Sequence, residues 1–324
     1  MDVPRLHAVL GNHPHVLPLK RGEIRSSLFE LEFIEYTPTN AAFKPMVREQ
    51  AFDVCEMAIV TYLMAKAYQK PLVLLPAAML GRHQFAYAIY DGARGVLGPG
   101  DLEGKRVGIR SFTTTTGAWI RGILANDYGV NLDKVHWVTF EDPHVAEYRD
   151  DTERAPAGKK ITQMLLEGEL DAVLGETAND PRLKPLFPDP AAEAARWFAE
   201  YGVVPVNHLV VVTDKLARER PDIVRELYDL LKQSKAKAEP AAAPDPVPFG
   251  VEANRKSLDL VIGYAAQQAL IPRRLAVDEL FDPTTHGFEL MAIDPKRWQI
   301  GLVGYGEVGR ILAEDPRRER LRKA

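Results

Sequence analysis

The segment VGIRSFTTTTGAWIRGIL, residues 107–124, decides how the rest of the chain is interpreted. It predicts a short buried strand at 105–110, then a threonine run, then an amphipathic helix. The run consists of Thr113, Thr114, Thr115 and Thr116. Threonine caps helices well, and the free N–H groups and positive dipole end of a helix start attract anions. Arg110 precedes the run and Arg121 lies within the helix, so we expect a carboxylate cradle here. The alternative is an ordinary threonine-capped helix.

Strand and helix patterns alternate outward from this segment, which favours an α/β fold. Predicted strands occupy residues 6–10, 31–36, 53–59, 72–75, 85–90, 106–110, 135–140, 171–175 and 203–212. Predicted helices occupy residues 15–23, 61–68, 116–126, 160–167, 191–201, 220–235 and 254–268. The chain crosses between two α/β units near 85–100 and near 203–210. We therefore predict a two-lobed architecture, with residues 1–90 and 208–290 in one lobe and 91–207 in the other. Ligands of such folds bind in the crevice outside the carboxyl ends of the strands.

The composition is that of a globular protein, with 46% hydrophobic and 27% charged residues among 324. A net charge of −4 makes nucleic acid and anionic membrane poor partners. A single cysteine, Cys55, excludes an intrachain disulfide, and its apolar neighbours indicate a small core residue. No apolar run reaches the length of a membrane span, and the N-terminus lacks the pattern of a secretory signal. We expect a cytoplasmic protein; a homo-oligomer stays open.

Several motifs occur in order along the chain. They are FDVCEMAIVTYLMAKAYQKP (52–71), GRH (81–83), GKRVGIRSFTTTTGAWIRGIL (104–124), VVPVNHLVVV (203–212) and PFGVEANRKSLDLVIGYAAQQAL (248–270). Together they resemble the 4,5-dihydroxyphthalate decarboxylase family, over roughly residues 5–281. The resemblance implies a type II periplasmic-binding-protein fold without export, and a carboxy-lyase acting on a small aromatic carboxylate. One difference is Phe43-Lys44-Pro45, which stands where the resemblance implies a His-Arg pair.

Decarboxylation of an electron-rich phenolic acid defines which residues to look for. Such a site needs a proton donor near the ring carbon and a base at the ring hydroxyl, and it needs no organic cofactor. His83 and His208 are the candidate donors; the alternative is a structural histidine at the hinge. Glu56, inside the apolar strand VCEMAIV, is the candidate base or the partner of an arginine. A structural ion pair is the alternative for Glu56.

Cations and neutral donors complete the predicted site, because arginine matches the two oxygens of a carboxylate. The substrate-binding candidates are Arg82, Arg110, Thr113, Thr114, Thr115, Arg121 and Asn207. A surface ion pair is the alternative for each arginine. His13, His15 and Glu176 are further polar residues at predicted strand ends. No spacing typical of metal ligands, such as HExxH or CxxC, occurs, so we assign no metal ligands, and metal dependence stays open.

The C-terminal segment QIGLVGYGEVGRILAED, residues 299–315, contains Gly304-x-Gly306-x-x-Gly309 between a predicted strand and helix. This segment resembles the start of a β-hydroxyacid dehydrogenase of the 3-hydroxyisobutyrate type. The chain ends at Ala324, so one strand and one helix cannot bury a nucleotide-binding core. We therefore interpret residues 291–324 as an appended segment and assign no nicotinamide cofactor.

Three functions compete at this stage. The leading hypothesis is decarboxylation of a hydroxylated aromatic acid. The second is a binding protein for a small aromatic or heteroaromatic carboxylate, because fold does not fix function. The third is a pyrimidine- or thiamine-precursor protein of the same fold. The arginines and threonines of the predicted crevice favour an anionic ligand over the third.

Overall fold

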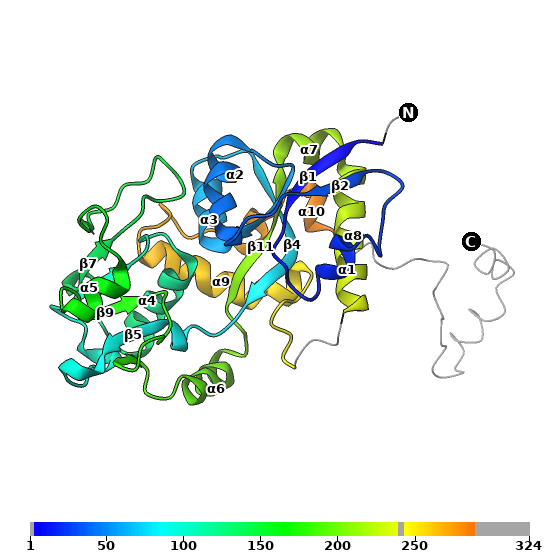
Figure 1. Cartoon of the computed structure of the whole chain (residues 1–324). Helices are drawn as coiled ribbons and strands as arrows, with labels where there is room; N and C mark the ends of the chain where they lie inside the picture. The colour runs from blue at the N-terminus through cyan, green and yellow to red at the C-terminus, as the bar shows by residue number, and fades with distance from the viewer. Residues whose placement is uncertain (1–2, 239–242, 289–324) are drawn as a thin grey trace, which may run out of the picture. The chain divides into compact units, whose positions relative to one another are not determined.

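Two β-sheets organise residues 3–238 and 243–288, which are the residues that this computed structural model describes (Figure 1). The first sheet has the order β2-β1-β3-β11-β4. Its strands are β1 (Arg5–Val9), β2 (Glu30–Phe33), β3 (Val54–Ala58), β4 (Leu72–Gly81) and β11 (Val206–Thr213). Strand β1 is parallel to β2 and β3, whereas β11 is antiparallel to both β3 and β4. The carboxyl ends of β1, β2, β3 and β4 therefore share one edge with the start of β11.

The second sheet has the order β10-β5-β9-β6-β7-β8. Its strands are β5 (Ala88–Asp91), β6 (Arg106–Ile109), β7 (His136–Thr139), β8 (Glu153–Arg154), β9 (Ala172–Leu174) and β10 (Leu183–Pro185). Strand β6 is parallel to β7 and β9, so these three carboxyl ends also share one edge. The chain enters this sheet between β4 and β5 and returns to the first sheet at β11, close to the two predicted crossings.

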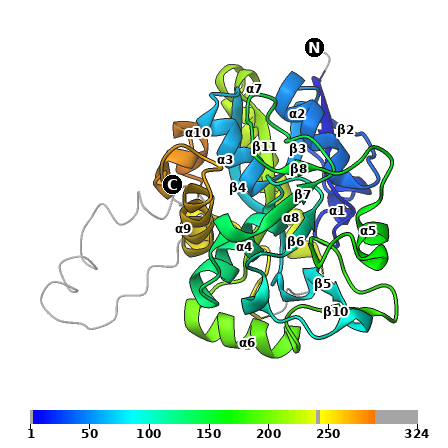
Figure 2. The same cartoon turned by 90° about the vertical axis from the view of Figure 1, so that its left-hand side faces the viewer.

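Helices cover both sheets (Figure 2). Those that pack with the first sheet or with each other beside it are α1 (Leu17–Lys20), α2 (Phe43–Glu49), α3 (Ile59–Ala67), α7 (Asp214–Glu219), α8 (Pro221–Lys237), α9 (Val251–Gln267) and α10 (Pro283–His286). Those of the second lobe are α4 (Thr115–Asp127), α5 (Ile161–Glu167) and α6 (Pro190–Tyr201). Helix α9 packs against α4 as well as against β4 and β11, so it contacts both lobes. The predicted α/β class with two lobes is confirmed.

Strand β4 continues past Pro76, although proline usually ends a strand. The sequence pattern predicts a strand ending at residue 75, before Pro76, because proline cannot donate to the ladder. The structure continues the strand to Gly81 across a bulge, since Leu209 pairs with Ala78 while Val210 pairs with Leu75. The extension matters because it carries the chain on to Arg82 at the edge of the sheet.

Two other predicted elements differ from the structure. The predicted strand at 85–90 begins as a 3-10 turn, Phe85–Tyr87, because Phe85 packs edge-on against Phe187; only β5 is extended. The predicted helix at 15–23 is the four-residue α1, which ends before Gly22, a residue with a positive φ of 69°. Helix α2 is not among the predicted helices. The dinucleotide-like motif at 299–315 and the rest of 291–324 lie outside the described residues.

Candidate active site between the two sheets

A pocket of about 550 Å³ is lined by the strand ends of both sheets. Polar residues from the first lobe are His13, Thr39, Asn40, Glu56, Arg82, Asn207 and His208. Polar residues from the second lobe are Arg110, Thr114, Thr115, Thr116, Glu141, His144 and Glu176. The pocket thus occupies the place predicted for a ligand of a two-lobed α/β protein.

Glu56 is the most buried carboxylate of this pocket, with 1% of its surface exposed. Its Oε2 accepts a hydrogen bond from the Gly11 backbone N–H at 2.8 Å and lies 2.9 Å from His13 Nε2. Its Oε1 lies 2.6 Å from His208 Nδ1. Burial alone would raise the pKa of Glu56, but the hydrogen bonds and charges of the two histidines outweigh it and hold this pKa well below its usual range. Glu56 is therefore ionised and bonded to two histidines, and no arginine of the described residues pairs with it.

The ionised carboxylate fixes the protons of both imidazole rings. A carboxylate only accepts hydrogen bonds, so His208 Nδ1 and His13 Nε2 must both donate to Glu56. In its neutral form, His208 then presents Nε2 as an acceptor, and this atom has no hydrogen-bond partner among the described residues. A pocket-lining acceptor, oriented by a buried carboxylate, has the arrangement of a general base.

Gly11 is required for this arrangement. A Cβ at this position would lie 2.6 Å from His13 Nε2 and 3.0 Å from Glu56 Oε2. Any side chain here would displace the histidine or break the N–H bond to the carboxylate.

Arg82 lies at the end of β4 and is half-buried. Its Nη1 donates to the Tyr87 hydroxyl at 3.0 Å and its Nη2 to Thr116 Oγ1 at 3.3 Å, while the guanidinium lies 3.8 Å from the Tyr87 ring centroid. Burial lowers the pKa of this guanidinium, and no carboxylate among the described residues pairs with it. A half-buried cation bonded only to neutral hydroxyls is suited to bind an anion from the pocket.

Arg110, at the end of β6, is shared between the lobes. Its Nη1 donates to Glu141 Oε2 at 3.3 Å within the second lobe. With its amide oxygen turned toward Arg110, Asn40 of the first lobe accepts from Nη1 at 2.8 Å and from Nη2 at 3.2 Å. Arg110 therefore holds the two lobes together and also faces the pocket.

The start of α4 lies beside the two arginines. Thr114 is the N-cap residue in extended conformation, and its side chain makes no capping hydrogen bond. The N–H groups of the first helical turn have no intrahelical acceptors. Gly117 in this turn packs so closely that a Cβ would lie 2.1 Å from Ile109 Cδ1. The structure thus places a helix N-terminus at the pocket, as the threonine run predicted.

His144 is a pocket residue that the sequence analysis missed. It lies in the loop after β7 and is 5% exposed, and its Nδ1 is 2.7 Å from Thr61 Oγ1. Arg48 of α2 fixes this loop by donating to the carbonyls of Pro143 and His144. Phe43, in the first turn of α2, packs its ring edge-on against His144 and His208, at centroid distances of 5.9 and 5.1 Å. Phe43 thus belongs to the first turn of a helix, and its ring forms one wall of the pocket.

The burial of His144 makes the stability of the protein depend on pH. Burial and the neighbouring positive groups lower the pKa of His144 to about 3. Those groups are Arg110, Lys44, Arg48 and His208. In the unfolded chain this imidazole binds a proton near pH 6.5. The contribution of neutral His144 to stability is therefore fully present above pH 6.5 and is lost as the pH falls toward 3.

We expect the free energy of unfolding to fall by up to about 1.4 kcal/mol per pH unit between pH 6 and 4 on account of His144. Urea unfolding at several pH values measures this slope. The variant His144→Gln is expected to show a shallower slope than the wild type, with His136→Gln, an exposed histidine, as control. Equal slopes in the wild type and His144→Gln would contradict this assignment.

The structure does not bring every predicted residue to the pocket. His83 packs among Phe85, Trp197 and Phe198, and its Nδ1 is buried without a partner. Burial lowers its pKa. Thr113 is buried, with its hydroxyl 3.2 Å from Ser111 Oγ. Neither residue lines the pocket, so neither enters the function proposed below.

Arg121 is fully buried and does not join Arg110 in one cradle. Its Nε donates to Gln268 Oε1 at 2.8 Å and its Nη2 to the Phe112 carbonyl at 2.7 Å. Its guanidinium lies 3.9 Å from the Phe112 ring centroid. Arg121 therefore ties α4 to Gln268 at the end of α9, outside the pocket lining.

Asn207 does line the pocket, although its side chain is 1% exposed. Gln84 Nε2 donates to Asn207 Oδ1 at 2.7 Å, which fixes the orientation of its amide. Trp119, the neighbouring aromatic on α4, is buried in the core and donates to the Val206 carbonyl, so it does not stack on a ligand.

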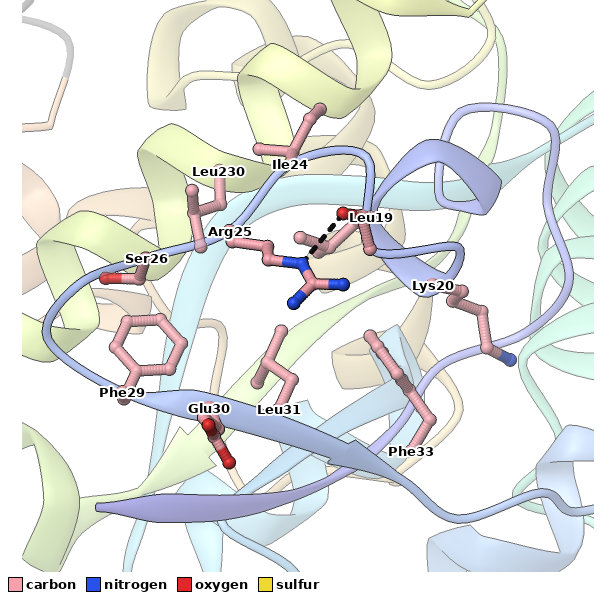
Figure 3. Close-up of a pocket in the computed structure, with 11 residues that line it drawn as sticks. Leu19, Lys20, Ile24, Arg25, Ser26, Phe29, Glu30, Leu31, Phe33 and Leu230 are labelled. Atoms are coloured by element: carbon pink, nitrogen blue, oxygen red, sulfur yellow. Dashed lines mark hydrogen bonds between the residues drawn. The ribbon is translucent and has the colours of Figure 1, made fainter. Parts of the chain in front are cut away.

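A second cavity, of about 480 Å³, lies beside α1 and β2 (Figure 3). Its wall combines apolar and polar side chains, and Arg25 reaches among Leu19, Leu31 and Phe33. The Arg25 side chain is exposed, and its Nε donates to the Gly22 carbonyl at 3.0 Å. This cavity holds neither a histidine nor a buried carboxylate, so the pocket between the sheets is the better candidate for chemistry.

Within residues 3–238 and 243–288, no three His, Cys, Asp or Glu side chains form a group that could hold a metal ion. In the same part of the chain, no helix combines the length and the apolar character needed to cross a membrane.

Comparison with known proteins agrees with the resemblance described from the motifs. No protein-family model matches the chain. A 4,5-dihydroxyphthalate decarboxylase from Comamonas testosteroni is 27% identical over 327 residues, covering 88% of this chain and 98% of the relative. A second, from Pseudomonas putida, is 29% identical and covers 61% of this chain and 83% of the relative. The chain is a homologue of these decarboxylases.

Solved structures show the fold of this homologue. The alkanesulfonate-binding protein SsuA from Xanthomonas axonopodis pv. citri superposes with a TM-score of 0.53 at 13% identity, covering 87% of this chain and 99% of SsuA. The desulfurization enzyme DszB also gives a TM-score of 0.53 at 13% identity, covering 89% of this chain and 99% of the enzyme. The fold is therefore that of type II periplasmic binding proteins, as predicted.

Proposed function

We propose that the protein decarboxylates a hydroxylated aromatic carboxylic acid of the 4,5-dihydroxyphthalate type, giving a dihydroxybenzoate and carbon dioxide. The homology to two decarboxylases supports this proposal. The observation that carries it is Arg82, a half-buried cation whose guanidinium, within the described part of the chain, bonds only to neutral hydroxyls. The pocket of Arg82 also contains the ionised Glu56 with its two histidines. Anion binding and proton transfer are thus available in one pocket.

Arg82 and the first turn of α4 are the proposed anchor of a substrate carboxylate. The guanidinium and the helix N–H groups are all donors, and the nearby Thr116 hydroxyl adds another. Arg110 supplies further positive charge at the same pocket. A carboxylate held in this way limits the orientations of the aromatic ring in the pocket.

His208 is the proposed base for the ring hydroxyl. Its Nε2 is the free acceptor of the ring, and Glu56 stabilises the positive charge that appears when this atom takes a proton. An ionised ring oxygen pushes electron density into the ring, so a ring carbon can accept a proton. Loss of carbon dioxide from that carbon then restores aromaticity. Histidine is thus the base and not the predicted proton donor, and Glu56, predicted as the base or as the partner of an arginine, is the positioning residue.

A non-catalytic binding protein is the competing proposal. The observation that favours it is that the anion-binding part of the pocket needs no proton transfer to retain a carboxylate. SsuA, which has the same fold, is a binding protein whose structure contains MOPS. The two proposals differ in one outcome, which is whether the bound acid is chemically changed.

A panel of acids separates the two proposals. The purified full chain is incubated with hydroxylated benzoates and phthalates, including 4,5-dihydroxyphthalate, and the acids and their products are quantified by chromatography. Conversion of one acid to the product lacking one carboxylate supports the decarboxylase. Tight binding of the same acids, with quantitative recovery, supports the binding protein.

A further inference from the structure

Glu176 is a pocket carboxylate that the function proposed above does not use. It follows β9 directly, after Gly175, whose φ of 97° turns the chain at the pocket rim. Its side chain is half-buried. No hydrogen bond or ion pair joins it to any other described residue. By contrast, Glu141, which lies in the loop after β7 of the same sheet, is paired with Arg110.

The surroundings of Glu176 make its ionisation less favourable than that of a free carboxyl. Burial raises the pKa of Glu176 and outweighs the opposing effect of Arg110, the charged group that acts on it from the adjacent strand end. An anionic substrate in the same pocket adds a further negative charge, which disfavours ionisation of Glu176 more strongly. Glu176 therefore differs from Glu56, whose pKa is lowered and which has no proton to give.

The proposed reaction needs a proton donor as well as a base. His208 accepts the proton of the ring hydroxyl from the first lobe, and Glu56 is ionised and fully engaged with its two histidines. Within the described pocket, Glu176 is a carboxyl of the second lobe that is free of partners. We propose that Glu176 is the catalytic acid that delivers a proton to the ring carbon bearing the departing carboxylate. This inference rests on the proposed decarboxylase function.

The proton and electron balance of the step is complete without a co-reactant. His208 Nε2 takes the hydroxyl proton, and the ring carbon forms a bond to the proton given by Glu176. The bond between that carbon and the carboxylate then breaks, carbon dioxide leaves, and the electron pair returns to the ring. His208 returns its proton to the ring oxygen, and water reprotonates Glu176. The net change consumes one proton and one carboxylate and yields one C–H bond and one carbon dioxide.

The isosteric variant Glu176→Gln tests this role, because its amide keeps the shape and loses the acid. We expect kcat for the converted acid to fall about 10²- to 10⁴-fold, the usual contribution of a general acid, with a KM change under about tenfold. Glu176→Asp, which keeps an acid on a shorter side chain, is expected to retain more activity than Glu176→Gln. The control is Glu200→Gln, which makes the same substitution at an exposed position on α6 and is expected to leave kcat unchanged.

A second measurement follows the proton itself. The wild-type protein is incubated with the dihydroxybenzoate product in deuterated water, and deuterium at the ring carbon that lost the carboxylate is measured by NMR. We expect Glu176→Gln to lose this exchange by the same factor as kcat. A kcat within threefold of the wild type, or undiminished exchange, would overturn the assignment of Glu176. Absence of any decarboxylation by the wild-type protein would instead overturn the proposed function.

Discussion

Replacing His208 by alanine is expected to lower kcat about 10²- to 10⁴-fold while changing the affinity for the acid much less. His208 Nε2 is the free acceptor in the pocket, and its Nδ1 lies 2.6 Å from the Glu56 carboxylate. Removing the ring removes the base that activates the substrate, whereas the anion anchor at Arg82 stays intact. Steady-state kinetics with 4,5-dihydroxyphthalate, together with calorimetric binding of phthalate, separates the two effects. Phthalate lacks the ring hydroxyls and serves as the unreactive analogue.

The alanine variant also leaves one oxygen of a buried carboxylate without a donor, at a cost of about 1–3 kcal/mol in stability. His208→Gln is therefore measured beside it, because glutamine can still donate to Glu56. The exposed His7 of β1, replaced by alanine, is the control for a histidine outside the pocket. Equal losses in turnover and in affinity for both His208 variants would make this histidine a binding residue only.

Replacing Arg82 by alanine is expected to weaken binding of phthalate about 10- to 100-fold. This range corresponds to a hydrogen bond between charged groups, which contributes about 1.5–3 kcal/mol. Among the described residues, the guanidinium has only the neutral Tyr87 and Thr116 hydroxyls as partners. A bound carboxylate would therefore supply the counter-ion that these residues do not. Titration calorimetry at fixed ionic strength measures the dissociation constant.

Arg110→Ala is the informative comparison for Arg82→Ala. Arg110 already shares its charge with Glu141 and donates to Asn40, so we expect its removal to weaken phthalate binding less than the removal of Arg82. Arg196→Ala, on the exposed face of α6, is the control and is expected to bind like the wild type. A dissociation constant for Arg82→Ala within twofold of the wild type would remove Arg82 from the anion site.

Local sequence patterns were sufficient for the features that depend on one segment. The strand, threonine run and helix at 105–127 are found within a residue or two of their predicted bounds, because apolar periodicity acts over a few residues. The buried strand around Glu56 was likewise predictable, because VCEMAIV is apolar apart from the glutamate. A carboxylate in such a strand must find polar partners. The identity of those partners was not predictable, because His13 and His208 are separated from Glu56 by 43 and 152 residues.

The residues that the sequence analysis missed lie in loops or turns whose position depends on contacts with the other lobe. His144 reaches the pocket because Arg48, 96 residues away in the sequence, donates a hydrogen bond to the backbone carbonyl of His144. Asn40 faces Arg110 across the two lobes. No local pattern encodes such contacts. Thr61, which binds His144, carries no signal apart from this contact. Phe43, which packs on His144, stands at the position that the family resemblance singled out.

Two departures had a signal in the sequence. Arg121 lies four residues after Gly117 on a helix, the same face as the residues packed against Ile109, so helical spacing places it in the interior. His83 is followed two residues later by Phe85, which starts a 3-10 turn buried against Phe187. That turn places the imidazole ring beside the aromatic side chains of α6 and away from the pocket.

The most direct test of this account is the release of labelled carbon dioxide from carboxyl-labelled 4,5-dihydroxyphthalate by the purified full chain, without added metal or cofactor. The account predicts release at a steady rate, with stoichiometric dihydroxybenzoate, and a rate at least about 100-fold lower in His208→Gln. Binding of the labelled acid with no release, under conditions where Arg82→Ala loses that binding, would contradict the decarboxylase. That result would make the protein a carrier or sensor of aromatic acids.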